Sequence, residues 1–176
     1  MERRFAIKQI LIMAGGLALL PSCLKDSGKS SIVLKNLTVS LDQELLLGDI
    51  AETMIPKTDT PGAKELNLHL FVLKMLDDCY EPEKQHEFLK GLDQLKQETE
   101  SQYAKSFSKL TAKEREEVLL KIQNNKEASI ELAGFYQIMK NKTMQGYMNS
   151  KYVMTNLKKW ELVPGRYNSY FPVKSA

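Results

Sequence analysis

Apolar residues recur with helical spacing through most of the chain. The clearest segment runs from Thr58 to Tyr80, where Pro61 fits the first helical position and Asp59 or Thr60 can cap the free amides that follow. Beyond Pro61 the apolar positions cover most of a helix circumference: Leu66, Leu68, Leu70, Phe71, Val72, Leu73, Met75, Leu76 and Cys79. A helix that is apolar on nearly all sides is buried by several neighbours. The pattern therefore predicts a helix that begins near Pro61 and lies at the centre of an all-α domain.

Other amphipathic segments are predicted to pack around this central helix. The capping-box pattern of Ser40 with Gln43 marks a helix with an apolar stripe. The stripe consists of Leu41, Leu45, Ile50 and Met54, reinforced by Leu46, Leu47, Ala51 and Ile55. Pro82 can begin a third helix, with Phe88, Leu89, Leu92 and Leu95 on its buried face. Thr111 with Glu114 repeats the capping box ahead of a charged helix that buries Val118, Leu119 and Ile122.

A second strongly apolar helix is predicted from about Ala128 to the region of Gly146, paired with the central helix, and a short helix over residues 151–158. Strand signals are few and no internal repeat is present. The predicted fold class is a single all-α multi-helix bundle with a buried central helix.

The C-terminal segment from Trp160 to Pro172 has no helical period. It carries Tyr167, Tyr170 and Phe171, with Arg166 among them, and these are residue types enriched in interface anchors. This irregular aromatic segment is expected either to cover its own bundle or to contact a partner, and the two roles are compatible.

The N-terminal residues 1–22 have the features of an export signal. A basic head with Arg3 and Arg4 precedes a short apolar run, which is too short to span a bilayer. The paired arginines resemble a twin-arginine signal, and the residues before Cys23 resemble a bacterial lipobox, in which Cys23 would carry lipid. The alternatives are the ordinary secretory route and an amphipathic or buried N-terminal helix. The predicted organisation is a signal peptide (1–22), a lipidated tether and extended arm (23–39) and a helical domain (40–176).

Charge and cysteine content agree with an envelope protein. The 176 residues include 25 basic and 22 acidic ones. Without residues 1–22 the charges nearly balance, and no block of basic residues remains to bind nucleic acid. Lipidation of Cys23 would leave Cys79 as the one other cysteine, so no internal disulfide is expected. Cys79 is predicted to be a small buried core residue.

Few residues could support catalysis. His69 and His86 are the two histidines; His69 is expected to be packed with one hydrogen bond and His86 to be solvated. Asp77 and Asp78 point about 100° apart on a helix, so they cannot jointly bind one metal ion without ligands from elsewhere. A structural role, such as capping, is the favoured interpretation of this pair and of Asp59. The chain contains neither a Cys-x-x-Cys-His haem site nor a Gly-x-Gly-x-x-Gly dinucleotide motif.

Several segments together resemble a known family, the small subunit (subunit 3) of membrane-bound gluconate 2-dehydrogenase and related flavoprotein dehydrogenases. The resemblance covers roughly Leu41 to Tyr170. The residues that carry it are Ile55 to Ala63, Met75 to Tyr80, Met139-Lys140, Thr143, Gly146-Tyr147 and Val163 to Tyr167.

The resemblance implies a non-catalytic accessory subunit. In such complexes a large subunit binds FAD and oxidises a sugar or sugar acid, a cytochrome c subunit is a further partner, and the small subunit carries the export signal. The chain would then be a periplasm-facing lipoprotein of a bacterial envelope, held at the membrane by Cys23. A free-standing envelope lipoprotein that acts as a scaffold is the alternative, and an enzyme with a site around His69, Asp77 and Asp78 is a third.

The partner interface is expected in loops, because loops carry function when helices form the scaffold. The residues predicted to face the partner are Thr58, Asp59, Thr60, Pro61, Gly62, Gly146, Tyr147, Pro164, Gly165, Arg166, Tyr167 and Tyr170.

Overall fold

A computed structural model describes residues 28–125 and 127–158, together with 160, 161, 163, 165 and 170. Within these residues the chain is all-α: α2 (Leu41–Met54), α3 (Leu68–Cys79), α4 (Pro82–Tyr103), the 3₁₀ turn η1 (Phe107–Lys109), α5 (Ala112–Asn124), α6 (Ile130–Met148) and the π-helical η2 (Val153–Leu157). The extended segment in the described part makes only an isolated bridge between Lys29 and Ser40. The predicted fold class is confirmed.

Three helices begin where their local sequence signals predict. Ser40 Oγ accepts a hydrogen bond from the Gln43 amide while Gln43 Oε1 accepts one from the Ser40 amide, which completes the capping box of α2. Thr111 and Glu114 make the same pair of bonds at α5. α4 begins at Pro82 as expected.

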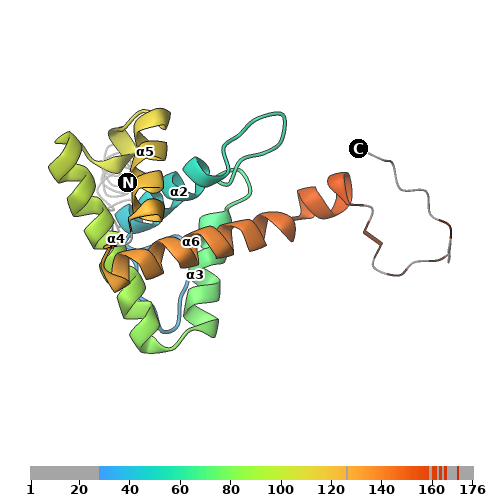
Figure 1. Cartoon of the computed structure of the whole chain (residues 1–176). Helices are drawn as coiled ribbons and strands as arrows, with labels where there is room; N and C mark the ends of the chain where they lie inside the picture. The colour runs from blue at the N-terminus through green and yellow to red at the C-terminus, as the bar shows by residue number, and fades with distance from the viewer. Residues whose placement is uncertain are drawn as a thin grey trace, which may run out of the picture.

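α6 is the helix that contacts most of the others (Figure 1). It runs across the bundle and packs against α4, α3, α5 and α2, then continues toward η2 beyond the packed helices. The predicted pairing of the two most apolar helices is confirmed, because α3 packs on α6. The central position, however, belongs to α6, whose buried residues include Leu132, Phe135 and Met139.

The helix predicted from Pro61 starts later, at Leu68. Residues 63–67 form turns, and Asn67 has a left-handed conformation with φ of 51°, which interrupts a regular helix. Asp59 and Thr60 therefore do not cap α3, whose N-cap residue is Asn67. Residues 55–67 instead form a long loop between α2 and α3 (Figure 1).

Three other expectations need correction. Cys79 is exposed, because it ends α3 at the turn into α4, beyond the crossing with α6. The stripe predicted for α2 is confirmed in part: Leu47, Ile50 and Ala51 are buried as expected, whereas Leu41 and Leu45 are exposed. Gly146 does not end its helix but lies inside α6, where a Cβ atom would come within 2.8 Å of Phe71 Cδ1.

Candidate partner interface

The loop of residues 55–67 is held in shape by a side chain of α2. The Glu52 carboxylate accepts hydrogen bonds from the backbone amides of Lys57 (3.1 Å) and Lys64 (2.7 Å). Gly62 is buried against this carboxylate, since a Cβ atom there would lie 2.5 Å from Glu52 Oε1. The Ala63 amide bonds to the Ile55 carbonyl at 2.9 Å and closes the loop. A side chain at position 62 would therefore displace the loop.

The loop surface is polar at its tip. The Lys57 ammonium lies 2.9 Å from the Glu65 carboxylate and lowers the pKa of that carboxyl. The Thr58 amide bonds to the Thr60 carbonyl at 3.0 Å, which makes a tight turn. Thr58 and Asp59 are exposed, Thr60 and Pro61 are half-buried, and Gly62 is buried.

The structure brings two of the predicted interface segments together. Tyr147 on α6 and Thr60 in the loop are joined by a 3.2 Å hydrogen bond between Tyr147 Oη and Thr60 Oγ1. Next to Tyr147, Gly146 allows α6 to approach Phe71 and Leu68 of α3 closely. The loop and the C-terminal half of α6 therefore form one continuous surface.

An apolar groove of about 240 Å³ adjoins this surface, between the end of α2, α5 and α6. We call it the methionine groove. Its lining residues are Thr53, Met54, Ile55, Glu116, Leu119, Leu120, Gln123, Tyr136, Lys140 and Met144. Tyr136 Oη donates a 2.6 Å hydrogen bond to Gln123 Oε1, and burial raises the pKa of the Tyr136 hydroxyl. The groove thus combines flexible apolar walls with a polar edge.

Large apolar side chains are exposed on and beside the methionine groove. Leu120 is 45% exposed, Met144 53% and Met148 44%. Met144 and Met148 are four residues apart, so they lie on the same face of α6. None of these residues was among the predicted interface residues. The sequence feature that could have identified Met144 and Met148 is their position outside the buried stripe of α6. That stripe includes Phe135, Met139 and Gly146.

The remaining predicted site residues fall into two groups. Gly165 and Tyr170 are exposed, Tyr170 by 90%. Arg3, Arg4, Cys23, Pro164, Arg166 and Tyr167 lie outside the described residues.

Asp77 has a structural role, although not the predicted cap. Its fully buried carboxylate accepts hydrogen bonds from the backbone amides of Lys35 (2.8 Å), Asn36 (2.7 Å) and Leu37 (2.9 Å). Burial by itself would raise the pKa of Asp77, but these three bonds and Lys74, 3.8 Å away, hold it below its ordinary value. Asp78 is exposed and pairs with Lys74 at 3.1 Å.

His69 does not form a catalytic centre with these carboxylates. It is half-buried, and its Nδ1 atom is buried without the predicted hydrogen bond. Burial lowers the pKa of His69, and Lys64 adds to this effect while Glu44 opposes it. His86 is exposed, as expected. Within the described part of the chain, no group of three His, Cys, Asp or Glu residues is arranged to bind a metal ion.

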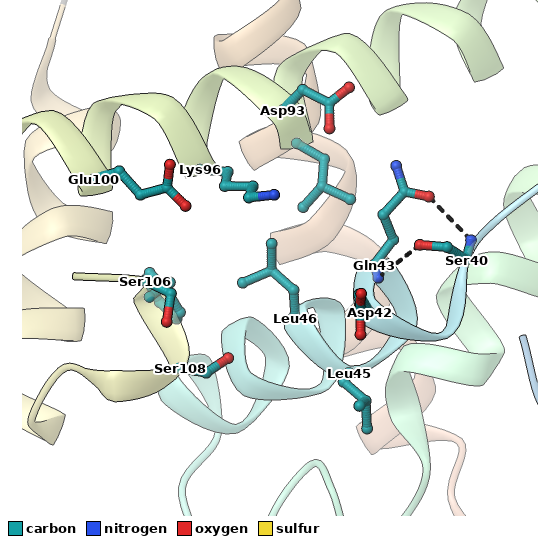
Figure 2. Close-up of a pocket in the computed structure, with 12 residues that line it drawn as sticks. Ser40, Asp42, Gln43, Leu45, Leu46, Asp93, Lys96, Glu100, Ser106 and Ser108 are labelled. Atoms are coloured by element: carbon teal, nitrogen blue, oxygen red, sulfur yellow. Dashed lines mark hydrogen bonds between the residues drawn. The ribbon is translucent and has the colours of Figure 1, made fainter. Parts of the chain in front are cut away.

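A second pocket, of about 610 Å³, lies between the start of α2, α4 and η1 (Figure 2). Asp93, Lys96 and Glu100 of α4 face Leu46 and the Ser40–Gln43 capping box across it. Ser106 and Ser108 complete one side. Its lining contains charges of both signs and no histidine.

The comparisons with known proteins identify the family. The family model described as gluconate 2-dehydrogenase subunit 3 matches residues 41–165, well over half of the chain. This range runs from the start of α2 past η2 and includes the 55–67 loop and the methionine groove. No match was found among curated proteins or solved structures. In the portion that the structure describes, no helix has the length and apolar character needed to cross a membrane. The chain belongs to the gluconate 2-dehydrogenase subunit 3 family.

Proposed function

We propose that the chain is a non-catalytic accessory and export-escort subunit of a membrane-associated, FAD-dependent sugar or sugar-acid dehydrogenase complex. In this proposal a larger partner binds the flavin and performs the oxidation. A lipid on Cys23 holds the complex at the periplasmic side of a bacterial membrane. The observation that carries the proposal is the family match over residues 41–165.

The surface described above supports an accessory role. Met144, which is exposed on the groove, is an adaptable contact for a protein partner, because the unbranched thioether side chain fits irregular surfaces. Exposed apolar side chains that cluster beside a polar loop are typical of interaction sites. The loop of residues 55–67 and the methionine groove are therefore the partner interface in this proposal, with Tyr147 joining them.

An escort role also has a physical rationale. A flavoprotein that takes up its cofactor before export must cross the membrane already folded. It can do so bound to a partner that carries a twin-arginine signal, and Arg3 and Arg4 are the residues of this chain that would supply it. The Cys23 lipid would then keep the complex at the membrane, where an electron acceptor can be reached.

A detergent pull-down of the native protein tests the proposal. The eluate is expected to contain a larger polypeptide and to show the absorbance bands of a flavin. A Cys23→Ser variant should retain this partner while losing its attachment to the membrane fraction. A colourless eluate that contains the chain alone would contradict the proposal and favour a free-standing scaffold lipoprotein.

A further inference from the structure

The N-terminal end of the described chain is fixed to the helical body. The Leu41 amide donates a hydrogen bond to the Gly28 carbonyl at 3.1 Å, and the Ser30 amide donates one to Val39 at 3.3 Å. The Ser31 amide and hydroxyl both donate to the Glu44 carboxylate at 2.6 Å. Gly28 is therefore held beside the first turn of α2.

This attachment leaves a short connection to Cys23. An extended chain spans at most about 3.6 Å per residue, so Gly28 lies within about 18 Å of Cys23 whatever the conformation between them. A lipid on Cys23 would thus bring the start of α2 close to the membrane surface. The far end of α2 has no such constraint.

Two apolar side chains are exposed at the start of α2, near Gly28. Leu41 and Leu45 are 36% and 56% exposed and lie four residues apart on one face of the helix. Nearby charges are mixed: Lys29 follows Gly28 and is exposed, Asp42 follows Leu41, and Asp93, Lys96 and Glu100 lie across the pocket of Figure 2. Because this surface is not a basic patch, a contact with lipid here would depend on apolar burial rather than on attraction to anionic headgroups.

We propose that the first turn of α2, through Leu41 and Leu45, rests on the lipid surface when Cys23 is acylated. This inference rests on the acylation in the proposed function. α2 contains 14 residues, which is about 21 Å at a rise of about 1.5 Å per residue. The methionine groove lies at the other end of this helix and faces away from the bilayer, accessible to a partner.

Depth-dependent fluorescence quenching tests this orientation. The full lipidated protein, with Cys79→Ser to remove the exposed thiol, receives one new cysteine, either Leu45→Cys or Met148→Cys as the control. Each variant is labelled with an environment-sensitive fluorophore and bound to phosphatidylcholine vesicles that contain a quencher-bearing lipid. The label at position 45 is expected to be quenched several-fold more than the label at 148. The difference should persist at high salt, since screening acts on charges.

Each contrary result is distinguishable. Equal quenching on protein that floats with the vesicles would overturn the orientation and leave the accessory function intact. A label at 45 that is shielded from water but not quenched by lipid would show that a protein covers this face. That result would also overturn the proposed orientation. Protein that fails to float would overturn the lipid anchor on which the orientation depends, while the flavoprotein pull-down would still test the partner.

Discussion

At the scale of single residues, Asp77 shows how a carboxylate can organise a segment distant in sequence. Three consecutive backbone amides, from Lys35 to Leu37, converge on its two oxygens. The carboxylate is fully buried, so its negative charge is compensated by these donors and by Lys74. Asp77 therefore holds residues 35–37 against α3.

Replacing Asp77 tests this role. Asp77→Asn removes the charge and turns one acceptor atom into a donor that faces backbone amides. We expect the free energy of unfolding to fall by about 2–4 kcal/mol, since each unsatisfied buried donor costs about 1–3 kcal/mol. Urea denaturation measures the loss. Asp78→Asn is the matched control, because Asp78 is exposed, and it should change stability by less than about 0.5 kcal/mol.

The pH dependence of stability offers a second test at this residue. Because the pKa of Asp77 is lower in the folded state, its contribution is fully present above the ordinary carboxyl pKa of 3.8 and is lost as the pH falls through the folded value. The stability gap between the wild type and Asp77→Asn should therefore shrink below about pH 4. A gap that stayed constant between neutral and strongly acidic pH would contradict this account.

At the scale of helices, the packing of α4 on α6 depends on Gly91. A Cβ atom at this position would lie 2.3 Å from the Glu131 carbonyl oxygen and 2.5 Å from Phe135 Cβ. The Phe88 and Phe135 rings, with centroids 4.9 Å apart, pack beside this close approach. The absence of a side chain at Gly91 thus sets the separation of the two helices.

A pair of glycine substitutions tests this packing. Gly91→Ala should lower stability by about 1–3 kcal/mol, because the new methyl group meets backbone that must move. Gly134→Ala is the matched control on α6, where a Cβ atom has no neighbour within 4 Å. It should raise stability by up to about 1 kcal/mol through helix propensity. Thermal unfolding measures the stability of the two variants. Equal changes in stability would refute the claim that Gly91 allows the close approach of α4 and α6.

At the scale of the whole molecule, α2 separates two exposed apolar surfaces. Its first turn presents Leu41 and Leu45 beside the N-terminal attachment, and its last turn contributes to the methionine groove. Figure 1 shows the 55–67 loop leaving α2 at this second end, near the C-terminal half of α6. In the proposed accessory role, this layout would allow attachment to a membrane and to a protein partner at the same time.

The partner contact can be tested with one charge. Met144→Glu places a carboxylate in the methionine groove and should weaken flavoprotein binding at least about tenfold, equivalent to about 1.4 kcal/mol. Quantitative co-purification measures the effect. Gln97→Glu adds the same charge to the exposed surface of α4, away from the groove, and should leave binding unchanged. Unaltered binding by Met144→Glu would exclude the groove from the interface.

The starts of three helices could be predicted from the sequence, because their stabilising interactions are local. The capping boxes of α2 and α5 join residues three positions apart, and Pro82 begins α4 through its own fixed φ angle. The helical spacing of the apolar residues likewise predicted the all-α fold class. These features depend on interactions within one or two helical turns, so neighbouring residues contain the information.

Other features depend on residues far apart in the sequence, and these follow from the packing of the helices. The Glu52 carboxylate of α2 bonds to the loop that precedes α3, and Asp77 binds amides about 40 residues earlier in the chain. Thr60 and Tyr147, 87 residues apart, meet at the candidate interface. Met144 and Cys79 are apolar yet exposed, because periodicity describes a helix face but not where the neighbouring helices end. Burial depends on those neighbours, and their placement follows from the packing of the whole bundle.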